Sequence, residues 1–208
     1  MKKILLLTWV ALLSLNLIYA QTEDDSVILS LNGIYVDEIL DDGDEGLGTT
    51  IELSLIVGES GGLLQTVGLE IGYITSELNE EFIYEFGIIE VDSDTTLVPL
   101  FANFAVQGEF SDANFIWKAG MGLGGIFVDA DVDVDFTISG EAFDSESFSD
   151  DDFILGAQFF GSVGYKLTEN SNISAGVRYM FAEDARLFGV EDEVLNSVAF
   201  DLGLSVAF

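Results

Sequence analysis

Residues 27–208 alternate between apolar and polar side chains with a period of two, in eight separate segments of roughly ten residues each. In the last segment Val198, Phe200 and Leu202 share one face, whereas Asp201 and Gly203 lie on the other. A period of two is typical of a β-strand whose two faces meet different surroundings. The chain therefore predicts eight strands, and the alternation begins at Val27, Ile51, Val67, Val98, Trp117, Phe153, Ile173 and Val198.

The two faces of these predicted strands differ in the same sense throughout the chain. One face is continuously apolar, and the other is small, polar and rich in glycine; Met121 and Leu123, for example, alternate with Gly122 and Gly124. A soluble sandwich or a lipocalin-like barrel has the opposite arrangement, with bulky side chains inside and polar ones toward water. We therefore predict an all-β fold, an eight-stranded antiparallel up-and-down transmembrane β-barrel over residues 21–208, closed because lipid cannot satisfy an open strand edge.

The connections between the predicted strands alternate between long and short. Outer-membrane barrels have long outer loops and short periplasmic turns, and an even number of strands puts both chain ends on the periplasmic side. The segment 82–91 is apolar enough to be a strand, and we interpret it as part of the second long loop or as a hairpin arm above the membrane. The predicted connections are residues 37–48, 58–62, 76–95, 109–114, 129–151, 166–171 and 183–196.

The first twenty residues have a pattern of their own. Lys2 and Lys3 precede an apolar run over residues 4–18, and polar and acidic residues follow directly after Ala20. This three-part pattern predicts a secretory signal peptide at residues 1–20, cleaved after Ala20. An N-terminal membrane helix is the alternative, but the apolar run is short for a bilayer about 30 Å thick.

Composition narrows the classes of function. The chain has 38 Asp and Glu against 6 Lys and Arg, so its net charge is −32, and loss of Lys2 and Lys3 with the signal peptide would make it −34. Yet 49% of the residues are hydrophobic and the mean hydropathy is +0.41, so acids and apolar residues must occupy separate places. The charge argues against a nucleic-acid partner, because phosphate binding needs patches of Lys and Arg. Without cysteine or histidine, the chain has no disulfide, no thiolate nucleophile and no imidazole base or ligand.

Four short segments carry a resemblance to a known family: residues 98–104, the glycine run 120–124, residues 176–179 and the terminal Phe208. With the alternation over residues 26–208, they resemble the small outer-membrane β-barrel superfamily, the porin-family barrels related in build to OmpA, OmpX and OmpW. The resemblance implies a monomer in the outer membrane of a Gram-negative-type cell, in contact with outer-membrane lipids and lipopolysaccharide. It implies that Phe208 is the signal read by the barrel-assembly machinery. Enzymes among such barrels rely on histidine, which this chain lacks, so we expect no enzymatic activity.

Five charged residues fall on the predicted inward face: Glu52, Glu70, Lys118, Arg178 and Asp201. An eight-stranded barrel is narrow enough for side chains to fill it, and a charge buried there without a partner bears a large desolvation cost. Arg178 and Asp201 lie at similar heights on adjacent predicted strands, so we expect them to pair. The five residues then form a salt-bridged plug; the alternative is a conduction path that they line.

Most acidic residues lie in the long connections, which hold 28 of the 38 when Asp152 is counted with the third. The simplest interpretation is a solvated outer face, and the alternative is Ca²⁺ or Mg²⁺ bound by clustered carboxylates. Asp129, Asp131, Asp133 and Asp135 are the weak candidates for metal ligands. They do not match an EF-hand loop, because the required glycine and the bidentate glutamate are missing, and their spacing places them on one strand face. We predict no obligatory cofactor.

These features together predict a non-enzymatic outer-membrane barrel with a structural or surface-interaction role, which displays acidic extracellular loops on a rigid scaffold. The alternative is a small cation-selective channel for ions or small solutes, selective because of its acidic mouth. A soluble secreted ligand-binding barrel is a third class, which the polarity of the two strand faces disfavours.

Overall fold

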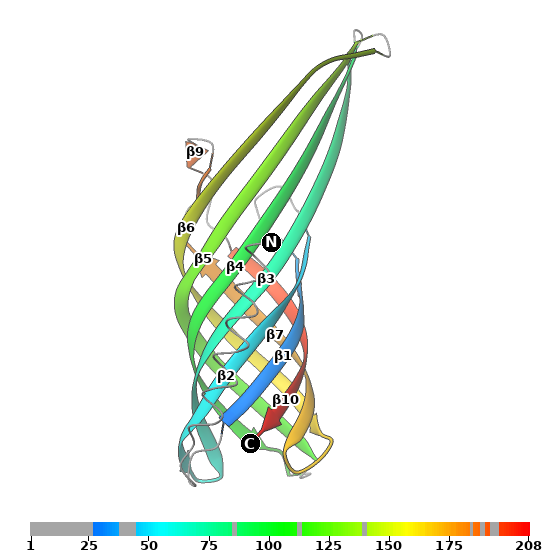
Figure 1. The fold of residues 1–208 in the computed structure, drawn as a ribbon. Coiled ribbons are helices and arrows are strands. Elements are labelled where there is room, and N and C mark those ends of the chain that lie inside the picture. The colour runs from blue at the N-terminus through cyan, green and yellow to red at the C-terminus, as the bar shows by residue number, and fades with distance from the viewer. Residues whose placement is uncertain are drawn as a thin grey trace.

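The structure, a computed structural model, is a closed ring of eight antiparallel strands (Figure 1). It describes residues 27–37, 45–84, 87–111, 114–138, 141–183, 185–187, 190–191 and 196–208. Consecutive barrel strands pair with each other, and the first closes on the last, which confirms the predicted fold class. The barrel strands are β1 (Val27–Val36), β2 (Gly46–Ser60), β3 (Leu63–Tyr84), β4 (Gly87–Glu109), β5 (Phe115–Ile138), β6 (Glu141–Lys166), β7 (Ser171–Ala182) and β10 (Asn196–Ala207).

Two of the predicted features lie outside the described residues: the signal peptide at residues 1–20 and most of the first long connection, residues 38–44. Across the described part of the chain, no helix has the length and apolar character needed to cross a bilayer.

The short connections all lie at one end of the barrel, which we call the turn end. They follow β2, β4 and β6, as predicted for 58–62, 109–114 and 166–171. Gly61 and Gly62 have φ of 63° and 79°, the left-handed conformation that a tight hairpin turn requires and that glycine adopts without strain. The ring also closes here, because the backbone amide of Phe208 donates to the carbonyl of Val27 over 2.9 Å.

At the opposite end, the loop end, four strands continue far beyond the rest of the ring (Figure 1). The β3–β4 ladder runs to Tyr84 and Gly87, and β5 pairs with β6 as far as Ile138 and Glu141. Because β4 and β5 also pair along this length, the four strands form one continuous sheet. We call it the projecting sheet and define it as residues 76–84, 87–95, 129–138 and 141–151.

The prediction of long loops over 76–95 and 129–151 is therefore wrong, whereas the placement of Asp129, Asp131, Asp133 and Asp135 on one strand face is confirmed. Only residues 85–86 and 139–140 separate the paired strands, and segment 82–91 forms the two arms of a hairpin, the second of the two interpretations offered for it. The error has a physical cause. A strand with a solvated face accepts an acid at every second position, so a high density of Asp and Glu does not by itself distinguish a loop from a strand.

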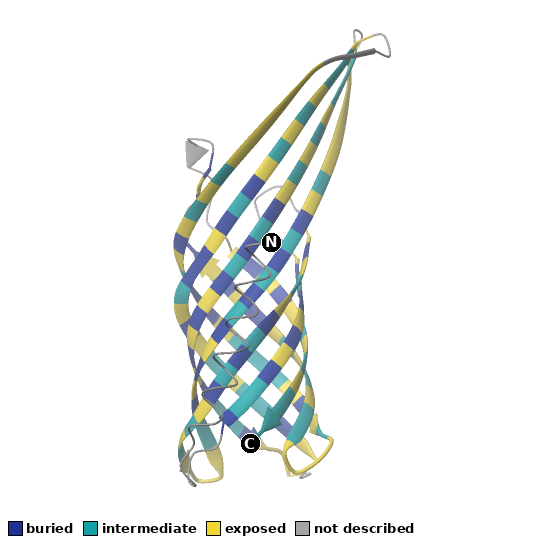
Figure 2. Ribbon diagram, in the orientation of Figure 1, coloured by how far each residue is buried: buried dark blue, intermediate teal, exposed yellow. Residues whose placement is uncertain are grey.

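Buried and exposed residues alternate along the barrel strands (Figure 2), and the buried ones form two layers along the barrel axis, a polar one and an apolar one. The polar layer contains buried charged, amide and hydroxyl side chains. The apolar layer lies nearer the loop end and corrects the prediction that the inward face is polar and small along its whole length. Its members are Ile34, Val36, Ile74, Leu97, Phe101, Ile126, Val128, Ala130, Ile154, Met180, Ala182, Ala185, Leu187 and Ala199.

A small hairpin follows β7, and the residues at its start pack against this apolar layer. It consists of β8 (Arg186–Leu187) and β9 (Val190–Glu191), within the fourth predicted long connection. Leu187 is buried in the layer. Asp152 on β6 anchors the hairpin, because its carboxylate accepts the backbone N–H of Arg186 and that of Phe153, each over 2.8 Å. These two backbone hydrogen bonds lower the pKa of Asp152 below its ordinary value.

Candidate functional site

Arg178 is the centre of the polar layer in the barrel. Its Nη1 donates to Glu70 and, over 3.0 Å, to the Gln158 side-chain oxygen, and its Nε donates to Asp201 over 3.3 Å. The side chains of Arg178, Glu70 and Asp201 are 5%, 2% and 10% exposed, so these charges are paired away from solvent. The predicted pairing of Arg178 with Asp201 is present, and Glu70 is an additional partner.

The remaining predicted interior charges form a second ion pair beside the first. Lys118 donates to Glu52 over 2.8 Å, and the hydroxyl of Ser54 donates to the same carboxylate over 2.7 Å. Glu52 and Glu70 are direct cross-strand neighbours on β2 and β3, so the two pairs meet in the centre of the barrel. The structure thus brings all five predicted interior residues together.

Two amide residues that the sequence reasoning did not single out connect the network. Gln158 donates to Asn103 over 2.9 Å, and Asn103 donates to Glu70 over 3.3 Å. Gly122 makes room for them, because a Cβ at this position would lie 2.1 Å from the side-chain oxygen of Asn103. Within the described residues, no buried side-chain nitrogen or oxygen lacks a hydrogen-bond partner. Both amides lie in alternating segments opposite the apolar face, so the alternation alone could have placed them inside the barrel.

The interior leaves little open space. A cavity of about 40 Å³ lies beside the five charges, and another of about 20 Å³ lies nearer the turn end. The first has room for about three water molecules and the second for one or two, since one water needs about 10–15 Å³ of such volume. Above them the apolar layer fills the barrel, and Phe101 and Leu97 are 1% exposed. The barrel axis therefore passes through a layer of paired charges and then through a mainly apolar layer.

The outer wall carries a belt of exposed large apolar side chains around the barrel. Leu69, Leu123 and Leu202, on three different strands, are 65%, 71% and 72% exposed. Aromatic pairs occupy both ends of the belt: Phe115 and Tyr165 near the turn end, with ring centroids 5.3 Å apart, and Phe127 and Phe153 near the loop end, 4.5 Å apart. Exposure of this extent is unfavourable in water and suits a lipid surround.

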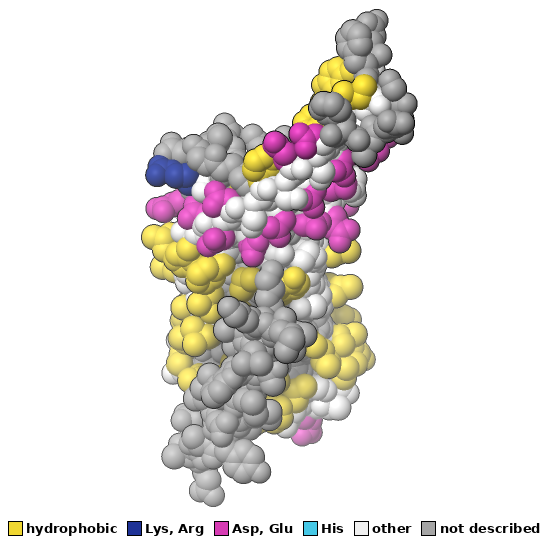
Figure 3. All heavy atoms as spheres, turned by 45° about the horizontal axis from the view of Figure 1, so that its top comes forward, with side chains coloured by type: hydrophobic (Ala, Val, Ile, Leu, Met, Phe, Trp, Pro, Cys, Tyr) yellow, Lys and Arg dark blue, Asp and Glu magenta, His cyan; other side chains and the backbone are white. Residues whose placement is uncertain are grey.

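Above this belt, the outer face of the projecting sheet is acidic (Figure 3). The register places Asp131 beside Asp94, Asp133 beside Asp92, and Asp135 beside Glu90, on the strands β5 and β4. Asp131, Asp133 and Asp135 are exposed, and Asp129 is partly buried. The four candidate metal ligands thus share one strand face, but no group of three or more acids within the described residues is arranged to hold a metal ion.

The opposite face of the projecting sheet continues the barrel interior and is apolar along its middle. We call residues Ile89, Val91, Val132, Val134 and Phe136, on the central strands β4 and β5, the apolar stripe. All five are partly exposed. The register places Glu80 on β3 at one side of the stripe, and Glu146 and Asp144 on β6 at the other. The sheet is therefore two-faced, with one acidic face and one apolar face that has acidic margins.

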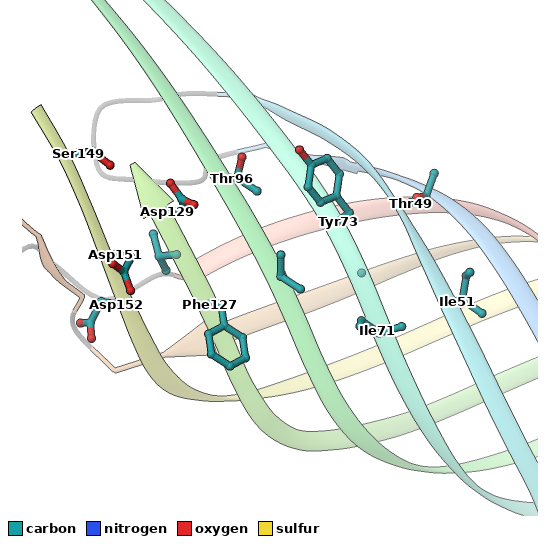
Figure 4. A pocket seen from close by; sticks show the side chains of 13 residues that line it. Thr49, Ile51, Ile71, Tyr73, Thr96, Phe127, Asp129, Ser149, Asp151 and Asp152 are labelled. Carbon is teal, nitrogen blue, oxygen red and sulfur yellow. The ribbon is translucent and has the colours of Figure 1, made fainter. Parts of the chain in front are cut away.

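A further pocket, of about 310 Å³, lies on the outer wall where the apolar belt meets the acidic face (Figure 4). Ile51, Ile71 and Phe127 line its apolar part, whereas Asp129 and Asp151 line its acidic part. Asp129 and Asp151 are cross-strand neighbours. The pocket marks the level at which the wall changes from apolar to acidic.

Comparison with known proteins finds similarity to solved structures alone. No protein-family model matches the sequence, and no curated protein matches it. The structure is similar to a major outer membrane protein from Thermus thermophilus (TM-score 0.49, 12% identity, covering 89% of this chain and 100% of that chain). It is also similar to the N-terminal β-barrel domain of Pseudomonas aeruginosa OprF (TM-score 0.43, 12% identity, 88% and 97% covered) and to Neisserial surface protein A (TM-score 0.40, 14% identity, 88% and 97% covered). The closed eight-stranded barrel that the resemblance implied is the fold that the strand pairing shows.

Proposed function

We propose that the protein is a non-enzymatic outer-membrane barrel that does not conduct solutes and that holds the projecting sheet outside the cell as an interaction surface. The observation that carries the proposal is the continuity of the structure: four barrel strands run without a break from the apolar belt into the projecting sheet. A surface built on paired strands is positioned by the barrel rather than by loop conformation.

The location follows from the same features. The apolar belt requires lipid, and a closed ring leaves no unpaired strand edge within it. The predicted signal peptide would deliver the chain across the inner membrane. We propose that Phe208, which is 53% exposed next to the closing strand, is the signal that the barrel-assembly machinery recognises. Outer-membrane lipids and lipopolysaccharide are then the surroundings of the belt, and a monomer is the expected state.

A cation-selective channel is the alternative function, and the interior disfavours it. The five interior charges are paired with each other rather than lining an open path, and the hydrophobic side chains of the apolar layer offer an ion no ligands in place of its hydration shell. The absence of histidine and cysteine from the sequence supports a role without catalysis.

Conductance tests this proposal. The chain from Gln21 to Phe208 is refolded, inserted into planar bilayers and measured in potassium chloride, with and without calcium. Flotation of the same preparation with lipid vesicles checks insertion, so that silence is not mistaken for failure to insert. We expect silence in both conditions. Reproducible cation-selective steps would contradict the proposal and would favour the channel.

A further inference from the structure

We propose that the apolar stripe of the projecting sheet is a docking site for a cationic amphipathic helix of a partner protein. This inference rests on the proposed function, because it assigns a partner chemistry to the sheet that the barrel displays.

The apolar stripe is partly exposed to solvent. Beyond the hairpin of β8 and β9, the described residues leave the stripe partly open to solvent, and the large residues beside it are more open still: Phe82 is 43% exposed and Phe148 is 47% exposed. At the tip a groove of about 420 Å³ continues the stripe and is lined by Ile89, Phe136 and Ile138 among others. Apolar surface of this kind on a soluble part of a protein marks an interaction site.

Negative charges surround the stripe. Glu80 flanks it on β3, and Glu146 and Asp144 flank it on β6, where both also line the tip groove. Residues 76–95 and 129–151 contain no Lys or Arg, so nothing on the projecting sheet balances these carboxylates. An occupant with an apolar centre and cationic sides matches this pattern. A second copy of the chain does not, because it would bring the same acidic margins and a net charge of −32 into contact with them.

The dimensions of the stripe match those of one short α-helix. Strands lie about 4.8 Å apart, so the stripe on two central strands is about 10 Å wide, the diameter of one α-helix with its side chains. From Val132 to Ile138 the stripe and the tip groove together are about 20 Å long, which corresponds to about 14 helical residues. Lipid is not the expected occupant, because the stripe lies above the apolar belt and on the face that continues the barrel interior.

The test measures binding of a labelled peptide to the protein in phosphatidylcholine nanodiscs, with empty nanodiscs as the blank. The probe is an 18-residue peptide of Leu and Lys with its Leu residues on one helical stripe. A scrambled peptide of the same composition and a Leu–Glu peptide with the same pattern are the controls. We expect the Leu–Lys peptide alone to bind, with affinity that weakens in salt.

Two double variants distinguish binding at the stripe from non-specific electrostatic attraction to the acidic sheet. Glu80→Gln with Glu146→Gln neutralises the margins of the stripe, and Glu90→Gln with Asp133→Asn makes the same change of charge on the outer face. Exposed ion pairs contribute modestly to binding, so we expect the first variant to lose about tenfold in affinity and the second less than twofold. Equal losses would overturn the proposal in favour of non-specific attraction.

A direct readout covers the case in which a variant folds poorly. Because the chain has no cysteine, an environment-sensitive dye can be attached at Ser93→Cys on the face of the stripe or at Ser147→Cys on the acidic face of the same sheet. The peptide should change only the emission of the dye at position 93. A change only at position 147, or no binding at all, would refute the docking site. Either result leaves the proposed function standing if the barrel is silent in bilayers.

Discussion

Replacing Arg178 with alanine tests whether the interior is a paired plug. The guanidinium contacts Glu70 and Asp201, and the side chains of all three residues are at most 10% exposed. Removing one partner of a buried ion pair costs about 3–5 kcal/mol, because the remaining charge is left without compensation. Here two carboxylates lose their partner, and the hydrogen bond to Gln158 is lost as well. We therefore expect a loss near the upper end of that range.

The assay is urea-induced unfolding from lipid vesicles, followed through the fluorescence of Trp117, the single tryptophan of the chain from Gln21 onward. Lys166→Ala is the matched control, since it removes an ion pair with Glu109 in which the side chains are 30% and 54% exposed. The control should cost no more than about 1 kcal/mol.

The double variant of Arg178→Ala with Glu70→Gln sharpens the test. A neutral amide at position 70 needs no cation, so the double variant should recover about 1–2 kcal/mol relative to Arg178→Ala alone. If Arg178→Ala costs no more than the Lys166→Ala control, the reasoning is refuted, and Arg178 lies in a hydrated site rather than in a plug.

Three other predictions follow from the geometry. Gly122→Ala should destabilise the barrel by about 1–3 kcal/mol in the same unfolding assay, because its Cβ would overlap the side chain of Asn103; Gly161→Ala, whose Cβ would have its nearest neighbour at 3.8 Å, should be close to neutral. The lowered pKa of Asp152 means that its carboxylate stabilises the β8–β9 hairpin above its ordinary pKa of 3.8 and loses this effect as the pH falls through the lower folded value. Hydrogen-exchange protection of the hairpin amides, corrected for intrinsic rates, should fall in that acidic range, and Asp152→Asn should abolish the pH dependence. Asp133→Asn should make the projecting sheet more resistant to protease at low salt, by up to about fivefold, because it relieves repulsion between carboxylates on adjacent strands; the difference should vanish in 1 M salt, and its persistence there would contradict the electrostatic explanation.

The sequence predicted the barrel because membrane strands have a strict period and a strict polarity. Alternations such as Val198, Phe200 and Leu202 against Asp201 and Gly203 leave little freedom in register, since a slip of one residue would turn the whole apolar face inward. The short turns were predicted for a similar reason, because Gly61 and Gly62 favour a tight turn between two periodic segments.

The projecting sheet was predicted only in part: the spacing from Asp129 to Asp135 indicated a strand face and segment 82–91 was offered as a hairpin arm, but the remaining residues were assigned to loops from their composition. Asp131, Asp133 and Asp135 alternate with Val132 and Val134, which is the pattern of a strand as clearly as any in the barrel. The local density of acids was taken as a sign of loops. The β8–β9 hairpin has two-residue strands and hence no measurable period, so only tertiary structure reveals it.

The candidate interior was predicted in its members but not in its connections. The alternation along each strand was enough to assign the five charges to the inward face. It could not reveal the contact between Arg178 and Glu70, which crosses the barrel between strands that are not neighbours in the ring. The apolar layer could have been predicted from the sequence. Ile126, Phe127 and Val128 are apolar in succession, so both faces of the strand are apolar there, which an assignment by alternation alone overlooks. A pattern of this kind predicts that the interior is dry at that height.

The central claim is that a membrane barrel holds the projecting sheet outside the cell. Single cysteines at Ser147→Cys on the projecting sheet and at Ser60→Cys at the turn end make a matched pair in this cysteine-free chain. A membrane-impermeant maleimide applied to intact cells of a Gram-negative host should label the cysteine at position 147 and should label the one at position 60 only after the outer membrane is permeabilised. Labelling of both in intact cells, or of position 60 alone, would contradict the account.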